Sequence, residues 1–185
     1  PNGININNFS KSTNIPKKLD NNSKKILFVG RFDEERKGFN ILLKTFLNLK
    51  KKFIDLNLIV AGSGNKDKLK KYFIPPNFDK DIIFLGDITQ DELPDYYKNV
   101  DLVCAPSIGN ESFGIILLEA MAAGSVLIAS SIESYKYLLD KNNYGFIYNS
   151  NFDAELGILI TKILLNELST EENIKNGLKN VQNYS

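Results

Sequence analysis

The sequence has 185 residues, which suffices for one domain with a sizeable core and is too short for two complete α/β domains. Its 23 basic and 22 acidic side chains nearly cancel, so the chain has no general electrostatic attraction to nucleic acid. It contains no histidine, which excludes Ser-His-Asp catalysis, Cys-His catalysis and histidine metal sites within this chain.

The only cysteine, Cys104, lies in the apolar run 102–105. A single cysteine cannot form an intramolecular disulfide, so we expect a reducing compartment, the cytoplasm. Because no histidine can activate this thiol, we expect it to be buried and inert. No apolar run approaches the roughly 18 residues that a transmembrane helix needs, so none is predicted.

Short apolar runs alternate with amphipathic segments along most of the chain. Residues 1–22 are rich in Asn, Ser and Lys, and we interpret them as a connector with a turn at Asn2-Gly3 and a short ordered stretch near residues 4–9. Strands are predicted over residues 25–30, 56–61, 82–86, 101–105, 125–129 and 145–148. Helices are predicted over residues 39–49, 67–73, 91–98, 114–123, 152–163 and 171–183. The pair Pro75-Pro76 is expected to end the second helix.

Strands that are apolar on both faces recur at roughly 25-residue intervals, with helices between them. This order predicts an α/β fold, with a Rossmann-like parallel sheet and helices on both of its faces. Ligands of such sheets bind at the carboxyl ends of the strands. The loops of interest therefore follow Val29, Ala61, Leu85, Ala105 and Ala129.

The loop at residues 30–38 leaves the first strand and leads into a helix. It carries Arg31 and Lys37, two cations that suit a diphosphate, since Arg offers a fork of donors and Lys a point charge. The helix N-terminus would add free N–H groups and a partial positive charge. Solvation of both side chains is the alternative, and the spacing alone does not decide between the two.

The next two loops carry weaker signals. Gly62-Ser63-Gly64 begins like a dinucleotide-binding fingerprint, but Asp67 stands where the third glycine belongs, so a plain turn is the better interpretation. Close approach of a ligand to the backbone at Gly62 stays open. In the loop at residues 86–89, Asp87 or Thr89 is expected to cap the following helix.

Two glutamates accompany the helix predicted over residues 114–123. Glu111 comes just before it, and Glu119 lies inside it among apolar neighbours, where a carboxylate is costly unless it is paired or faces a polar ligand. In a functional interpretation both carboxylates accept hydrogen bonds from hydroxyls of a bound molecule, and the helix N-terminus near Gly114 meets an anion. In a structural interpretation Glu119 pairs with a Lys or Arg at the edge of the core, and Glu111 is simply exposed.

The order and spacing of these features resemble glycosyltransferase family 4, and within it the C-terminal, donor-binding domain of the GT-B fold. The motifs are Gly30-Arg31-Phe32 with Lys37-Gly38, Ala61-Gly62-Ser63-Gly64, Phe84-Leu85-Gly86, Pro106-Ser107, Glu111-Ser112-Phe113-Gly114 and the run 118–124. Glu111 and Glu119 form the family's E-x7-E motif. The runs 30–38 and 111–115 look most similar to phosphatidylinositol mannosyltransferases, which favours mannose as the sugar.

The resemblance implies a role for each motif. Arg31 and Lys37 would hold the donor diphosphate and stabilise the leaving nucleoside diphosphate. Glu111 would bind hydroxyls of the transferred sugar and complete the catalytic set, and Glu119 would bind the ribose. The other donor-binding positions would be Gly30, Gly62, Ile88, Ser112, Phe113, Gly114 and Ile115. Backbone N–H groups from Phe113 to Ile115 would contact the sugar or the phosphate.

The chemistry of the family follows from the same resemblance. Its members transfer the sugar with retention and need neither a cofactor nor a metal ion in the site. The donor would be a GDP- or UDP-linked sugar. Base contacts near residues 86–89 are largely to backbone in this family, so the nucleotide cannot be identified from side chains.

The resemblance also predicts how the chain is organised. Residues 1–22 resemble the segment that joins the two domains of these enzymes, and residues 23–185 resemble the C-terminal domain, cut before its last helix. The N-terminal acceptor-binding domain, with the histidine that many members carry, is expected in a longer protein. That domain would supply the lipid or glycan acceptor site and any peripheral contact with the inner face of the membrane, and the isolated chain is expected to be inactive.

Two alternatives stay open. One is a module that binds a nucleotide sugar without turnover, which the missing domain and the absent histidine favour for this chain alone. The other is a different α/β nucleotide enzyme. An NAD-dependent enzyme is one example, and the incomplete glycine fingerprint argues against it.

Overall fold

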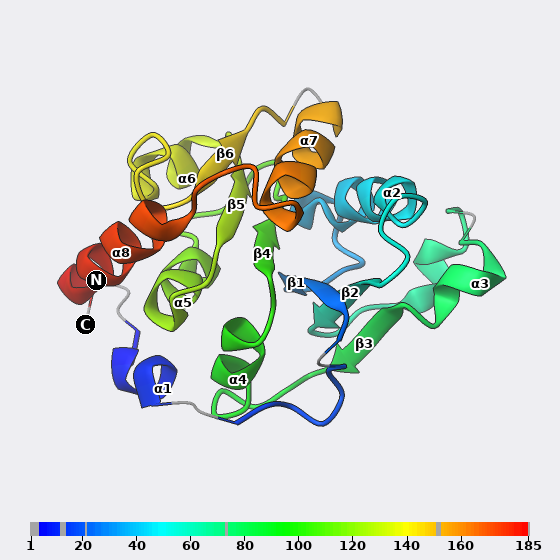
Figure 1. The fold of residues 1–185 in the computed structure, drawn as a ribbon, viewed down its shortest axis with the longest axis horizontal. Coiled ribbons are helices and arrows are strands. Elements are labelled where there is room, and N and C mark those ends of the chain that lie inside the picture. Colours follow the sequence, from blue (N-terminus) through cyan, green and yellow to red (C-terminus); the bar gives the residue numbers. More distant parts are fainter. Residues whose placement is uncertain (1–3, 12–13, 21, 73, 151–152, 185) are drawn as a thin grey trace.

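The computed structural model describes residues 4–11, 14–20, 22–72, 74–150 and 153–184. Its centre is a six-stranded sheet in the order β3-β2-β1-β4-β5-β6, with every neighbouring pair parallel (Figure 1). The strands are β1 (Lys24–Val29), β2 (Leu56–Ala61), β3 (Ile82–Gly86), β4 (Leu102–Ala105), β5 (Leu127–Ser130) and β6 (Phe146–Tyr148). All six predicted strands are confirmed, with bounds that differ by at most two residues.

The central strands are buried on both faces, which explains their unbroken apolar sequences. Along β1, Ile26 and Phe28 point into one layer of the core, and Leu27 between them points into the other, because side chains alternate along a strand. All three side chains are at most 2% exposed. Each apolar face of the sheet therefore needs a cover of helices.

Helices cover both faces. On the face that Phe28 enters, α2 (Phe39–Leu49) and α7 (Asp153–Leu164) contact each other. The other face carries α1 (Ile6–Lys11), α4 (Leu93–Lys98), α5 (Ile115–Ala123) and α8 (Glu171–Asn180). The predicted Rossmann-like sheet with helices on both faces is confirmed.

The helix predicted over residues 67–73 is wrong. Its described residues form a short 3-10 helix, η2 (Lys66–Leu69), followed by a turn, and Phe73 lies outside the described residues. Pro76 does not end a helix but begins one, α3 (Pro76–Asp79). Proline is tolerated in the first turn because the N–H it lacks would have no partner there.

Near the C-terminal end, the structure adds one element and divides another. The unpredicted helix α6 (Glu133–Leu138) has six residues, too few for a clear helical period, and is anchored by the fully buried Tyr135. The helix predicted over residues 171–183 is α8 followed by a 3-10 helix, η3 (Val181–Tyr184). Phe152, predicted at the start of α7, lies outside the described residues, as does the Asn2-Gly3 turn.

The described part of residues 1–22 packs onto the sheet's helical cover. The stretch expected to be ordered near residues 4–9 overlaps α1, which contacts α4 and α5. Phe9 is 7% exposed, and its ring lies 5.9 Å from the ring of Tyr97, centroid to centroid. Ile4 donates its N–H to the carbonyl oxygen of Tyr184 at 3.1 Å, so the two ends of the described chain lie side by side (Figure 1).

The composition led to expectations about Cys104 and about membrane-spanning helices. Cys104 is fully buried in β4, as predicted, and burial raises the pKa of its thiol. Within the described ranges, the structure contains no helix with the length and apolar character to cross a membrane.

Candidate functional site

Three glycines meet at the carboxyl ends of β1, β2 and β3. Gly62 donates its N–H to the carbonyl oxygen of Gly86 at 2.8 Å, and Gly30 donates to Ala61 at 2.9 Å. A Cβ atom on Gly62 would lie 2.4 Å from the carbonyl oxygen of Gly30, so glycine is required for this approach. The strand ends therefore pack backbone against backbone at the edge where ligands of parallel sheets bind.

A cavity of about 200 Å³ opens on these glycines. Its lining includes Gly30, Arg31, Gly62 and Ile88, four of the positions that the sequence assigned to the site, together with Leu93 at the start of α4. The structure thus brings these four predicted residues to one place.

The turn that follows Ile88 is held by reciprocal hydrogen bonds between Thr89 and Glu92. Thr89 donates its N–H to Glu92 Oε2 at 3.2 Å, and Glu92 donates its N–H to Thr89 Oγ1, also at 3.2 Å. The hydrogen bonds from Thr89 lower the pKa of Glu92. These bonds lie in the turn before α4, and Leu93 then lines the cavity. Within the described residues, the N-cap residue of α4 is Glu92 and makes no side-chain cap hydrogen bond, so the expected cap of this helix by Asp87 or Thr89 is not found.

Glu111 is held by two cations from the loop that follows β1. Lys37 Nζ lies 2.5 Å from Glu111 Oε1, and Arg36 Nη1 lies 3.3 Å from the same oxygen. Ser107 donates its hydroxyl to this oxygen at 3.2 Å. The side chains of Glu111 and Lys37 are only 13% and 19% exposed. The interpretation of Glu111 as simply exposed is therefore wrong, and so is that of Lys37 as fully solvated.

Backbone packing explains how residues 74 positions apart come into contact. Ile108 donates its N–H to the carbonyl oxygen of Arg36 at 2.9 Å, which joins the loop after β4 to the 3-10 helix η1 (Glu35–Lys37). Gly38 follows η1 with φ 67°, and a Cβ atom there would lie 1.9 Å from the carbonyl oxygen of Pro106. A side chain at position 38 would push the two loops apart.

Arg31 differs from Lys37 in its surroundings. Its side chain is 60% exposed, and its guanidinium lies 3.7 Å from Asp33 and 3.5 Å from Glu34. Asp33 itself is only 7% exposed, but a pair whose guanidinium is largely in solvent contributes about 0–1 kcal/mol and offers little resistance when a ligand competes for the guanidinium. The Arg31 side chain is thus mostly solvated, as the alternative interpretation supposed.

The structural interpretation supposed a Lys or Arg as the partner of Glu119. Among the described residues, the partner is a tyrosine instead. The hydroxyl of Tyr97, which is fully buried, donates to Glu119 Oε2 at 2.8 Å. Burial raises the pKa of Glu119, and the hydrogen bond from Tyr97 partly offsets the rise. Burial also raises the pKa of Tyr97 well above its ordinary value, so this hydroxyl stays protonated and acts as the donor.

Glu119 also faces a cavity. This second space, of about 200 Å³, lies between α1 and α5 and is lined by Ile115 and Glu119 on one side and by Asn5 and Asn8 on the other. Leu93 lines both this cavity and the one above the glycines, so the two adjoin. Glu119 therefore lies in a cavity that adjoins the glycine-lined one.

The N-terminus of α5 lies between the two glutamates in sequence. Gly114 precedes the helix with φ 83°, and no side chain caps the first turn, in which Leu117 donates its N–H to the carbonyl oxygen of Gly114 at 2.9 Å. Ser112 and Ile115 are exposed, whereas the ring of Phe113 packs against Tyr184 with centroids 5.9 Å apart. Ser112 and Ile115 are thus accessible to a ligand, whereas Gly114 is buried.

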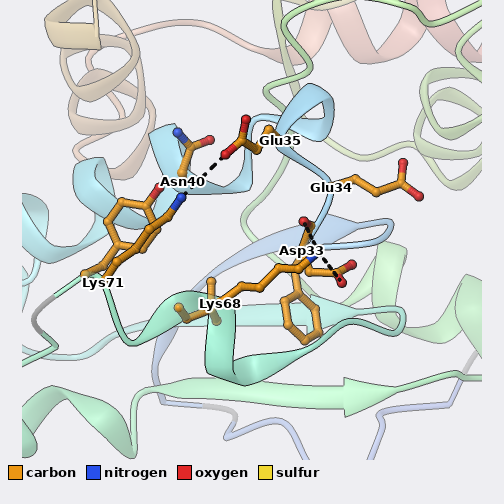
Figure 2. Close-up of a pocket in the computed structure, with 9 residues that line it drawn as sticks. Asp33, Glu34, Glu35, Asn40, Lys68 and Lys71 are labelled. Atoms are coloured by element: carbon orange, nitrogen blue, oxygen red, sulfur yellow. Dashed lines mark hydrogen bonds and ion pairs between the residues drawn. The ribbon is translucent and has the colours of Figure 1, made fainter.

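A further pocket, of about 290 Å³, was not predicted from the sequence (Figure 2). Asp33 and Glu35 turn toward Lys68 and Lys71, at 3.3 Å and 3.5 Å, whereas Glu34 points away from both lysines (Figure 2). A backbone hydrogen bond from Asn65 and the ammonium of Lys68 hold the pKa of Asp33 below its ordinary value. Despite these carboxylates, the described residues contain no cluster of three or more His, Cys, Asp or Glu side chains placed to hold a metal ion.

Sequence reasoning missed Arg36 and Tyr97. Arg36 stands next to Lys37 in the loop that was singled out, so its charge was visible but its partner was not. Tyr97 carries no such signal, because a tyrosine on the buried side of a helix is ordinarily a core residue.

The parallel sheet, with its ligand-binding edge at the carboxyl ends of β1 to β4, defines a Rossmann-like α/β domain. Residues 10–180 match the family model described as "Glycosyl transferases group 1". The chain belongs to this family, and the predicted membership of glycosyltransferase family 4 is confirmed.

Individual relatives place the chain more closely within the family. It is 31% identical over 184 residues to the phosphatidyl-myo-inositol mannosyltransferase of Mycobacterium leprae, a match that covers 100% of this chain and 48% of that protein. The predicted similarity to such mannosyltransferases is confirmed. The chain spans about half the length of the curated relatives it matches.

Solved structures identify the fold. The crystal structure of the C-terminal domain of the group 1 glycosyl transferase LpcC from Francisella tularensis superposes with a TM-score of 0.79 at 23% identity, covering 98% of this chain and 97% of that one. Anabaena HepE in complex with UDP-glucose gives a TM-score of 0.79 at 19% identity, covering 99% of this chain and 52% of that one. The fold is that of a GT-B C-terminal domain.

Proposed function

We propose that this chain is the donor-binding domain of a retaining glycosyltransferase and that it holds a nucleotide sugar at the carboxyl edge of its sheet. One observation carries the proposal: cations and carboxylates gather around adjoining cavities at this edge. Arg31 lines the cavity above the glycines, and Glu119 lines the cavity beyond Leu93. Lys37 and Glu111 form an ion pair between the loops after β1 and β4.

The parts of a donor can be assigned to these positions. The nucleoside would lie in the glycine-lined cavity against the backbone of Gly30 and Gly62 and the side chain of Ile88, with its ribose toward Glu119. The diphosphate would meet Arg31 and Lys37. The sugar would meet Glu111 and the loop at Ser112–Ile115, where the N-terminus of α5 offers free N–H groups.

This assignment has a chemical rationale. When the sugar leaves its nucleotide, negative charge develops on the departing diphosphate. Cations that are already in place lower the barrier, since they bind the transition state better than the ground state. Arg31 is held only by weak surface pairs and can turn toward the phosphates at little cost.

The relatives support the proposal in two ways. HepE, which has the same fold, has been crystallised with UDP-glucose. The Mycobacterium leprae relative is named as a mannosyltransferase, which supports mannose as the sugar, and we propose a GDP- or UDP-linked donor. We propose further that a second domain, in a longer cytoplasmic protein, binds a lipid or glycan acceptor and makes any peripheral contact with the membrane.

Thermal denaturation with candidate ligands tests donor binding. A ligand that binds the folded chain raises its melting temperature by mass action. Each ligand is screened at about 1 mM. We expect stabilisation by at least one of UDP-glucose, GDP-mannose and ADP-glucose, and no effect of NAD. Stabilisation by NAD alone would point to a different nucleotide enzyme. Sugar transfer by the isolated chain would contradict the assignment of the acceptor site to a second domain.

A further inference from the structure

Arg36 links the two loops that carry the proposed diphosphate and sugar contacts. Its Nη2 lies 2.8 Å from Glu34 Oε2, and its Nη1 lies 3.3 Å from both Glu111 Oε1 and the carbonyl oxygen of Asn110. Its own carbonyl oxygen accepts the N–H of Ile108. Figure 2 shows that Glu34 points away from the lysines of the neighbouring pocket, and its carboxylate contacts Arg36 through Oε2 and Arg31 through Oε1.

The contacts to Glu111 fall on one of its two oxygens. Lys37, Arg36 and Ser107 all meet Oε1. In the part of the chain that the structure describes, Oε2 makes no hydrogen bond, so it is the oxygen left to accept from a ligand hydroxyl. A carboxylate held through one oxygen in this way has its orientation fixed before a ligand arrives.

The two cations on Glu111 are not equivalent. Lys37 is a single ammonium on a flexible stem, and a bound diphosphate would draw its charge away from Glu111. Arg36 is held by Glu34 through one arm of its planar fork, while the other arm reaches Glu111. Arg36 therefore remains as the counter-ion of Glu111 when Lys37 turns to the phosphates.

We infer that Arg36 is a positioning residue: through its bridge between Glu34 and Glu111, it keeps the Glu111 carboxylate oriented toward the transferred sugar. This inference rests on the proposed function, and it concerns the sugar part of the donor only. Arg36 would make no contact with the nucleotide. Its loss should weaken the gain in affinity that the sugar provides and leave the affinity for the bare nucleoside diphosphate unchanged.

The experiment compares two ligands that differ by the sugar. Isothermal calorimetry gives the dissociation constants of UDP and UDP-glucose, and of GDP and GDP-mannose, for the unmodified chain and for Arg36→Gln. For whichever pair the unmodified chain binds, we expect the ratio of the two constants, nucleotide over nucleotide sugar, to fall about fivefold in Arg36→Gln, within the range for a typical hydrogen bond. Affinity for the bare nucleotide should not change.

A second variant and a matched control complete the test. Arg36→Lys keeps the charge but cannot bridge two carboxylates, so we expect a ratio between those of the unmodified chain and Arg36→Gln, and it serves alone if Arg36→Gln does not fold. Lys136→Gln removes an ion pair with Glu133 at 42% exposure, similar to the 40% of Arg36, and should leave the ratio unchanged.

The remaining outcomes would refute either the positioning role of Arg36 or the proposed function. An unchanged ratio in both Arg36 variants refutes the positioning role, as does an equal loss of affinity for nucleotide and nucleotide sugar, which would make Arg36 a structural strap. A sugar that adds no affinity in the unmodified chain also refutes it. If the unmodified chain binds none of the four ligands, the proposed function fails, and the inference fails with it.

Discussion

The buried hydroxyl of Tyr97 donates a hydrogen bond to Glu119 across 2.8 Å, between two helices that pack on the same face of the sheet. Tyr97 comes from α4, which follows the hydrogen-bonded turn between Thr89 and Glu92, and Glu119 comes from the apolar helix α5. The bond gives a carboxylate in an apolar environment the partner that it needs. It also fixes which oxygen of Glu119 remains for a ligand in the adjoining cavity.

Replacing Tyr97 with Phe should destabilise the chain by about 1–3 kcal/mol, because the partly buried Glu119 carboxylate would lose its hydrogen-bond donor. The pKa of Glu119 should rise further, since the bond from Tyr97 lowers it. Urea denaturation measures the loss in unfolding free energy. Tyr96→Phe, on the same helix but without a contact to Glu119, is the control and should cost clearly less. Equal losses in the two variants would show that this bond contributes nothing specific.

Glu119 should make stability depend on pH. Its folded pKa is raised, so the folded state binds its proton more tightly than the unfolded state does. The resulting penalty is absent below about pH 4, the ordinary range of a glutamate, and grows as the pH rises toward the folded pKa. We expect Glu119→Gln to gain stability relative to the unmodified chain over this window, as followed by denaturation at a series of pH values.

Asp33 should behave in the opposite way, which makes Asp33→Asn an internal comparison. Its folded pKa is lowered, first by the backbone hydrogen bond from Asn65, so its stabilising contribution is present above the ordinary pKa. That contribution is lost as the pH falls through the folded value. The difference in unfolding free energy between the unmodified chain and Asp33→Asn should shrink on acidification below about pH 4. A difference that stays constant would contradict the shift.

Gly38→Ala should cost more stability than its backbone angle alone explains. A left-handed residue other than glycine costs about 1–2 kcal/mol, and at Gly38 the new Cβ would also lie 1.9 Å from the carbonyl oxygen of Pro106. Gly124 has a similar φ of 71°, but its nearest neighbour would be an ordinary 3.7 Å away. Gly124→Ala therefore measures the angle alone. Equal losses in thermal or chemical denaturation would mean that the loops at residues 38 and 106 separate freely.

Arg31→Ala should weaken donor binding by about 1.5–3 kcal/mol, the usual worth of a hydrogen bond between charged groups. Folding stability should hardly change, because the Arg31 side chain is 60% exposed and its ion pairs are long, at 3.7 Å and 3.5 Å. Calorimetry with the nucleotide sugar measures the affinity. Lys68→Ala is a matched control, since Lys68 is 61% exposed against 60% for Arg31 and also contacts Asp33. Unchanged donor affinity in Arg31→Ala would refute its phosphate role.

Much of the fold was predictable because its signals are local. Each strand is a short run that is apolar on both faces, and such runs at regular spacing permit few arrangements other than a covered parallel sheet. The same rule placed Gly30, Arg31, Gly62 and Ile88 at one edge, and the structure puts all four around one cavity. The misplaced helix at residues 67–73 shows the limit of such signals, since periodicity over few residues does not distinguish an α-helix from a 3-10 turn.

The sequence by itself determined the sheet, the loops at its carboxyl edge and the charged residues on them, because strand burial and chain order dictate which loops share an edge. Only the tertiary structure decided how those residues pair. Arg36 meets Glu111 across 75 positions, and Tyr97 meets Glu119 across 22. Such contacts depend on how closely two loops or two helices approach, which is set by the packing of the whole core, with Gly38 against Pro106 as one example.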